Sequence, residues 1–263
     1  MTNTSTAIPV SDKDAFESSG YIGPLEALSE NECHDMATAM IEELGDLAER
    51  KKPKGVGHKI KRLGMKLGLT TKEHKTSGGK YNRHFDWPLI EALVSNPRIL
   101  DAVKSTLGPD IVLWRSNIFC QYASDTDSLP WHRDQYNQIL HDVDKQVSVQ
   151  LAISETTKEN CLEVLPGSHS MSNEEISEAF KMSIKENADP AGNTHYHTNE
   201  PLSIPTQVIL NRGEFILFHP DTLHRSSISD GSEAALRLCV TLRYTVPGNL
   251  ISTPERPRKE VPV

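Results

Sequence analysis

The stretch Leu129–Tyr136, with the sequence LPWHRDQY, contains the side chains best suited to hold a metal ion. His132 and Asp134 are two residues apart, so on a β-strand both side chains leave the same face. An imidazole nitrogen and a carboxylate oxygen held side by side suit a divalent first-row metal. We therefore interpret this pair as half of a metal site, with the remaining ligand supplied by a later strand.

A second histidine would complete a known ligand set. Two histidines and one carboxylate on one face of an ion form the facial triad of non-haem iron(II) oxygenases. The stretch Phe218–Ser226 offers His219 and His224 for this role. The other His-x-Asp pair, His84 and Asp86, lies at the entrance of an expected helix, where an aspartate usually caps the helix or interacts with its dipole. It is the poorer candidate.

Composition restricts the class of protein. The chain has 263 residues, 37% of them hydrophobic and 24% charged, which is enough apolar material for one large domain. A net charge of −8 argues against nucleic acid as the main partner. The cysteines are far apart and form no C-x-x-C pair, so we expect reduced thiols in a cytoplasmic protein: Cys33, Cys120, Cys161, Cys239. No signal peptide and no membrane span are expected.

Helices precede strands along the chain. Ser11 and the Ser29/Glu32 capping box begin expected helices at about 11–20 and 29–49, and two more begin at Pro88 and Pro97. Later segments alternate with period two, apart from a helix at about 172–181. With the strand at His132, the expected strands are 111–122, 146–153, 161–165, 206–210, 215–218 and 236–244. We predict one α+β domain over 1–263, with a helical part at about 11–107, a β core at about 111–245 and an extended proline-rich tail.

The expected strand at 236–244 has one polar face. Arg237, Cys239, Thr241 and Arg243 point one way, so at least one arginine lines a cavity or ends at its rim. A guanidinium beside a metal site is suited to bidentate capture of a carboxylate, and 2-oxoglutarate needs such an anchor.

Other polar and aromatic residues have two interpretations each. On the expected strand 111–122, Asn117 and Gln121 either contact a co-substrate or are ordinary polar residues of a strand. Trp131 and Tyr136 could be pocket walls, although aromatic residues beside a strand are more often core. His195 and His197 could form another metal pair, but surface histidines are the simpler interpretation.

The combined motifs resemble the phytanoyl-CoA dioxygenase family of iron(II)/2-oxoglutarate oxygenases. The similarity runs from about Asp14 to Tyr244. The motifs that carry it are His132-x-Asp134, Asn160–His169 (NCLEVLPGSH), Gly213–His219 (GEFILFH), His224-x-Ser226 and Arg237.

The resemblance implies a fold, a ligand set and cofactors. The fold is a double-stranded β-helix, or jelly roll, with N-terminal and flanking helices. Iron(II) is held by His132, Asp134 and His224, and 2-oxoglutarate by Arg237 with the Ser226 hydroxyl. The arginine of the family usually lies a couple of residues closer to the distal histidine, which leaves Arg243 as a second candidate for the anchor.

The expected reaction is hydroxylation of a small molecule, such as an amino acid or a natural-product intermediate. Iron(II), 2-oxoglutarate and O₂ are the cofactors, and succinate and CO₂ are released. Alternatives are desaturation or cyclisation with the same cofactors, a non-catalytic jelly-roll binding protein, and a cupin-like metalloenzyme that does not use 2-oxoglutarate. The segments 50–85 and 183–205 are expected to select the substrate. The basic residues within 50–66 are either a solvated surface or an attraction for carrier-bound acyl substrates.

Overall fold

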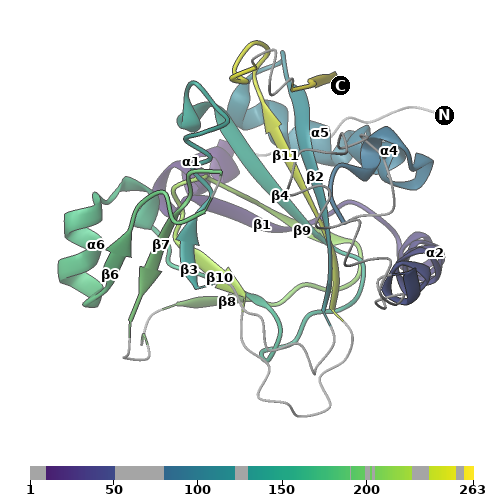
Figure 1. The fold of residues 1–263 in the computed structure, drawn as a ribbon, viewed down its shortest axis with the longest axis horizontal. Helices are drawn as coiled ribbons and strands as arrows, with labels where there is room; N and C mark the ends of the chain where they lie inside the picture. The colour runs from purple at the N-terminus through teal and green to yellow at the C-terminus, as the bar shows by residue number, and fades with distance from the viewer. Residues whose placement is uncertain are drawn as a thin grey trace, which may run out of the picture.

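Two antiparallel sheets form the centre of the molecule (Figure 1). The computed structural model describes residues 10–50, 80–121, 130–189, 191–198, 202, 205–226, 237–252 and 258–263. Within these residues the larger sheet has six strands in the order β1-β9-β4-β11-β2-β12. Their bounds are β1 Tyr21–Glu26, β2 Val112–Gln121, β4 Gln146–Ala152, β9 Glu214–Phe218, β11 Arg237–Thr245 and β12 Val261–Pro262.

The smaller sheet also has six strands, in the order β6-β7-β3-β10-β5-β8. Their bounds are β3 Trp131–Arg133, β5 Leu162–Val164, β6 Ser183–Lys185, β7 Thr194–His197, β8 Thr206–Val208 and β10 His224–Ser226. The predicted α+β architecture with a β core is therefore observed. Two of the candidate ligands, His132 and His224, come from β3 and β10, which are neighbours in this sheet.

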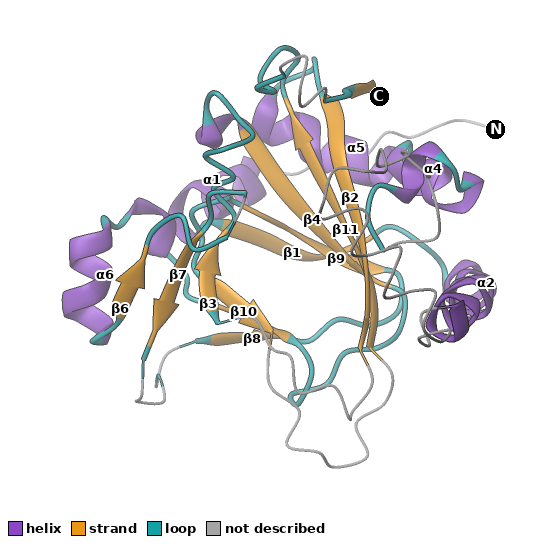
Figure 2. Cartoon of the chain, in the orientation of Figure 1, coloured by secondary structure: helices purple, strands orange, loops and turns teal. Residues whose placement is uncertain are grey.

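Helices cover the outer face of the larger sheet (Figure 2). They are α1 Val10–Ser19, α2 Glu30–Arg50, α4 Pro88–Val94 and α5 Pro97–Leu107, and α6 Asn173–Phe180 lies beside β6; short 3-10 turns lie at Arg83–Phe85, Val143–Lys145 and Ser168–Ser170. The capping box before α2 is present, because the Glu32 carboxylate accepts hydrogen bonds from the Ser29 backbone N–H at 2.8 Å and the Ser29 hydroxyl at 2.6 Å. Helix starts are thus encoded locally, as expected.

Period-two alternation in the larger sheet separates the helical core from the site. On β11, Leu238, Val240, Leu242 and Tyr244 pack in the core with the helices. The polar residues between them face the space between the sheets instead, and Arg237, Thr241 and Arg243 line a cavity there. Every residue of β11 is buried, so its polar face is an interior wall of the protein and not a solvated surface.

Several strands were not expected from the sequence. β1 pairs with β9 through Tyr21 and Phe218, β6 pairs with β7 inside a stretch that looked merely polar, and β12 adds Val261 of the proline-rich tail to β2. These strands lie at or next to sheet edges. Their sequences show no clear alternation of apolar and polar residues, so they are recognised only by the backbone pairing in the structure. The basic stretch after Arg50 and most of the segment 50–85 lie outside the described residues.

None of the helices in the described ranges is both long and apolar enough to span a membrane. The cytoplasmic location stays a prediction.

Arg133 fixes β3 from the face opposite to the candidate ligands. Its guanidinium donates hydrogen bonds to the backbone oxygens of Ser168 at 2.6 Å and Met171 at 2.7 Å, and to Asn173 Oδ1 at 3.2 Å. We expect Arg133→Met to lower the free energy of unfolding by about 3 kcal/mol, because one buried and two partly buried acceptors lose a charged donor. Urea denaturation measures this loss. The matched control, Arg98→Met, removes an exposed arginine 3.9 Å from Glu26 and should cost less than about 1 kcal/mol. Equal losses in both variants would contradict the anchoring role.

Candidate metal centre

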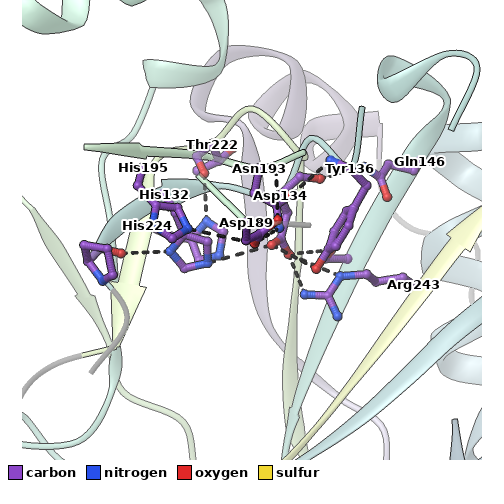
Figure 3. A network of polar contacts seen from close by, with 12 residues as sticks. His132, Asp134, Tyr136, Gln146, Asp189, Asn193, His195, Thr222, His224 and Arg243 are labelled. Atoms are coloured by element: carbon purple, nitrogen blue, oxygen red, sulfur yellow. Dashed lines mark hydrogen bonds and ion pairs between the residues drawn. The ribbon is translucent and has the colours of Figure 1, made fainter. Parts of the chain in front are cut away.

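Strand pairing brings three histidines into one row on the smaller sheet. His224 of β10 lies directly opposite His132 of β3, and His132 lies opposite His195 of β7. The ring centroids of His132 and His224 are 4.2 Å apart, and those of His132 and His195 are 6.1 Å apart (Figure 3). Residues opposite each other on neighbouring strands share a face, so all three imidazoles point to the same side of the sheet.

Asp134 joins this row just after β3 ends. Its backbone N–H donates to Pro220 O at 2.9 Å, and its backbone oxygen accepts a hydrogen bond from Gln146 Nε2 at 2.7 Å. These contacts place the carboxylate beside the imidazoles, with Asp134 Oδ1 3.8 Å from His132 Nε2. One ligand atom from each of His132, Asp134 and His224 lies within 4.8 Å of the others, and all three residues are buried.

Backbone carbonyls orient both imidazoles. Nδ1 of His132 is 2.9 Å from Pro130 O, and Nδ1 of His224 is 2.9 Å from Thr222 O. A carbonyl only accepts, so Nδ1 carries a proton in each ring, and the neutral imidazole then has its lone pair on Nε2. Metal-bound histidines are held in this way. The donor set therefore fits iron(II): two imidazoles and one carboxylate, already gathered on one side.

Asp134 is held as a carboxylate by its neighbours. Arg243 donates to Asp134 Oδ2 from Nη2 at 2.6 Å and from Nε at 3.2 Å, while the Tyr136 hydroxyl donates to Oδ1 at 3.2 Å. Burial raises the pKa of Asp134, but the positive charge of Arg243 outweighs it and holds the pKa well below its usual range. Figure 3 shows the imidazoles and Arg243 on different sides of this carboxylate.

His224 is a neutral imidazole in the folded protein. Burial is the main cause and the neighbouring His132 the next, and together with the other surrounding groups they lower the pKa of His224 to about 3. A metal ligand must have its lone pair free, so this environment prepares His224 for binding without an additional deprotonation step near neutral pH.

A cavity of about 200 Å³ lies beside the candidate ligands. Six of the seven predicted site residues line it: His132, Asp134, His224, Ser226, Arg237 and Asn117. The seventh, Gln121, pairs with Arg237 through the backbone, but its side chain lies outside the described part of the chain. The second candidate for the anchor, Arg243, also lines the cavity.

The competing histidines lie elsewhere. His219 packs against Phe16 and His169 and accepts a hydrogen bond from the Asp221 backbone N–H at 3.1 Å. His84 contacts the Ser116 hydroxyl at 2.8 Å. Neither lines the cavity.

Two residues differ from their simplest interpretation. His195, expected as a surface histidine, forms part of the cavity wall and is only partly exposed. Tyr136, expected as core, is buried and also presents its ring to the cavity. Trp131 does pack in the core, with Arg225 stacked on its ring at 4.8 Å.

Several contributors were not singled out from the sequence. They include Arg115, Gln150, Asp189 and Asn193, which line the cavity, and Ser148, whose hydroxyl donates to Asp134 Oδ2 at 3.4 Å. The alternating polar face of β4 was visible in the sequence. It faces the site, since Gln146 and Ser148 form hydrogen bonds to Asp134 and Gln150 lines the cavity. Asp189 and Asn193 come from a loop without periodicity, where no sequence signal marks them.

Comparison with known proteins identifies the family. The sequence model of the phytanoyl-CoA dioxygenase (PhyH) family matches residues 16–232. The chain belongs to this family. A search of curated protein sequences gives no significant match.

Solved structures share the fold at low identity. CytC3 with Fe(II) and alpha-ketoglutarate is 22% identical over 92% of this chain and 81% of its own, with a TM-score of 0.60. EctD from S. alaskensis with 2-oxoglutarate and 5-hydroxyectoine is 19% identical over 98% and 84%, with a TM-score of 0.62. The alpha ketoglutarate dependent carbocyclase SnoK from nogalamycin biosynthesis is 15% identical over 94% and 87%, with a TM-score of 0.63.

These findings confirm four expectations: the phytanoyl-CoA dioxygenase family, the jelly-roll fold, the class of iron(II)/2-oxoglutarate-dependent oxygenases, and the cofactors iron(II) and 2-oxoglutarate.

Proposed function

We propose that this PhyH-family protein hydroxylates a small-molecule substrate, with His132, Asp134 and His224 as the iron ligands. The observation that supports the ligand set most strongly is the preformed group of two oriented imidazoles and one ionised carboxylate within 4.8 Å of one another. When bound, iron(II) with 2-oxoglutarate and O₂ supplies the oxidising chemistry and releases succinate and CO₂. An amino acid or a natural-product intermediate suits a cavity of about 200 Å³, below the roughly 300–1,000 Å³ of typical ligand sites.

The chain's own residues hold and orient the participants. Arg237 anchors the distal carboxylate of 2-oxoglutarate, with the Ser226 hydroxyl as a second donor, because both line the cavity and Arg237 is buried. Asn117 lies on the neighbouring strand, opposite Thr241, and provides an amide for the same co-substrate. Arg243 and Tyr136 keep Asp134 ionised and aimed at the imidazoles.

Coupled product analysis tests this proposal. Purified protein with iron(II), 2-oxoglutarate and O₂ is incubated with a metabolite library, and succinate and substrate-derived products are measured together. Hydroxylation predicts succinate equal to product, and a product heavier by one oxygen atom. A product that has lost two hydrogens would instead indicate desaturation or ring closure. No succinate with any substrate, from protein that retains iron, would favour a binding protein or a metalloenzyme that does not use 2-oxoglutarate.

We expect the Asp134→Gly variant to lose hydroxylation activity. We also expect its thermal stability to increase when chloride is added. The variant leaves Arg243 buried without its counter-charge, and removal of one partner from a buried pair costs about 3–5 kcal/mol. A chloride ion can occupy the vacated side-chain volume beside Arg243. We therefore expect chloride to raise the melting temperature of the variant more than that of the wild type, with sulfate at equal ionic strength as the control. Unimpaired hydroxylation by Asp134→Gly would show that Asp134 is not a ligand.

A further inference from the structure

The cavity carries more positive than negative side chains among the described residues. Arg115, Arg237 and Arg243 line it, against the carboxylates of Asp134 and Asp189. In the proposed function, iron(II) and the 2-oxoglutarate dianion enter together and their charges cancel. An imidazole bound to iron is a neutral ligand, so one guanidinium charge remains without a counter-charge. A partly buried charge of this kind favours an anionic ligand.

Strand register separates the three arginines. Arg243 is already paired with Asp134 at 2.6 Å. Arg237 lies opposite Gln121 and Arg243 lies opposite Arg115, so Arg115 and Arg237 lie toward different ends of the β2–β11 pair. Six residues of strand span roughly 20 Å. A five-carbon dicarboxylate held by Arg237 is too short to reach across that distance, so Arg115 faces the part of the cavity left for the substrate that is oxidised.

Arg115 is held in an orientation that leaves its outer edge available. Its guanidinium carbon is 5.4 Å from the Tyr81 ring centroid and 5.3 Å from the Tyr136 ring centroid, and its Nε donates to Asn117 Oδ1 at 3.1 Å. Two flanking rings fix the plane of the guanidinium. The bond to Asn117 uses Nε, so the two terminal nitrogens remain for a ligand.

The surroundings of Arg115 favour an anion. Within the described residues no carboxylate lies within 4.0 Å of its guanidinium. Its direct cross-strand neighbour is Arg243, another cation, and like charges in opposite positions of paired strands repel. A bound anion removes that repulsion. The planar fork of an arginine matches a carboxylate through two parallel hydrogen bonds.

We propose that Arg115 binds a carboxylate of the substrate that is oxidised, so that this substrate is a small free acid and not an acyl group carried as a thioester. This inference rests on the proposed function and narrows its substrate class. The Tyr136 side chain lies between Arg115 and the proposed metal ligands, since its ring contacts Arg115 and its hydroxyl donates a hydrogen bond to Asp134. The carbon skeleton of the acid therefore extends from Arg115 along Tyr136 toward the metal ligands.

Binding to the anaerobic holoprotein tests the proposal without turnover. The protein with iron(II) and 2-oxoglutarate is titrated with a library of small carboxylic acids, α-amino acids included, each paired with its primary amide. Calorimetry and the visible absorption of the iron–2-oxoglutarate complex report binding. We expect at least one acid to bind at least about tenfold more tightly than its amide. Arg115→Gln should abolish this preference, Arg115→Lys should retain part of it, and the 2-oxoglutarate affinity should change less than about threefold in both.

Arg225→Gln is the matched control. Arg225 also stacks on an aromatic ring, that of Trp131, but it is paired with Glu163 at 2.6 Å and does not line the cavity. It should leave the preference for acids unchanged. The proposal is overturned if amides bind as tightly as acids, if no acid binds, or if Arg115→Gln weakens 2-oxoglutarate as strongly as the acid, which would make Arg115 a co-substrate residue. An absent iron–2-oxoglutarate absorption band would instead reject the proposed function itself.

Discussion

His224→Ala is expected to yield a folded protein that binds no iron(II) and forms no succinate. The imidazole of His224 lies against that of His132, with the ring centroids 4.2 Å apart. The contact of its Nδ1 with Thr222 O directs Nε2 toward the same point as the Asp134 carboxylate. Loss of an outer-shell partner of a metal ligand costs roughly 10–100-fold in affinity. Loss of a direct ligand should therefore weaken iron binding by more than about 100-fold, and His132→Ala and Asp134→Ala should do the same. Anaerobic iron titration and succinate formation measure the two effects.

His219→Ala is the matched control for this experiment. It removes an imidazole only five positions away, from the same stretch of chain, but from a cluster with Phe16 and His169 outside the cavity. It should keep most of the iron affinity and of the turnover, and His84→Ala should do likewise. If His219→Ala loses iron while His224→Ala keeps it, the distal ligand has been assigned to the wrong histidine.

The candidate ligands could be predicted because their signal is local. His132 and Asp134 are two positions apart in the sequence, in β3 and just after it, and a distal histidine followed by a serine at +2 completes the motif. Helix starts were equally readable, since capping boxes such as Ser29/Glu32 are formed by residues three positions apart. The motif does not predict the cross-strand register, which places His224 directly opposite His132.

The supporting residues could not be predicted because they are brought together by folding. Gln146 reaches the Asp134 backbone from β4, and Arg243 reaches its carboxylate from β11, 109 positions away in the chain. His195 lies on β7 and lines the cavity because β7 pairs with β3. The sequence of this short strand has no clear alternation that would have predicted the pairing. An antiparallel sheet commonly has one solvated face, so the sequence alone does not distinguish a polar residue on the surface from one in a site. In this protein both faces of β4 and β11 are buried.

Arg237→Ala is expected to raise the apparent KM for 2-oxoglutarate at least about tenfold while iron binding survives. Arg237 and Arg243 share the cavity-facing side of β11, six residues or roughly 20 Å apart, so one small dicarboxylate cannot be gripped by both. Nε and Nη2 of Arg243 already donate hydrogen bonds to Asp134 Oδ2, so Arg237 is the better anchor for the co-substrate. Loss of a charge-assisted bidentate contact typically costs about 1.5–3 kcal/mol, or one to two decades in affinity.

Arg243→Ala should give a different pattern, because its partner is a proposed metal ligand. It leaves the buried Asp134 carboxylate without its main counter-charge, so we expect lower stability and weaker iron binding, with a smaller change in the 2-oxoglutarate KM once iron is saturating. Arg237→Lys keeps the charge and loses the fork, so its KM should fall between those of the wild type and Arg237→Ala. Titrations of 2-oxoglutarate at saturating iron(II) decide between the two arginines. A large KM increase in Arg243→Ala with an unchanged KM in Arg237→Ala would move the anchor to Arg243, and the ion pair with Asp134 would then have to open when the co-substrate binds.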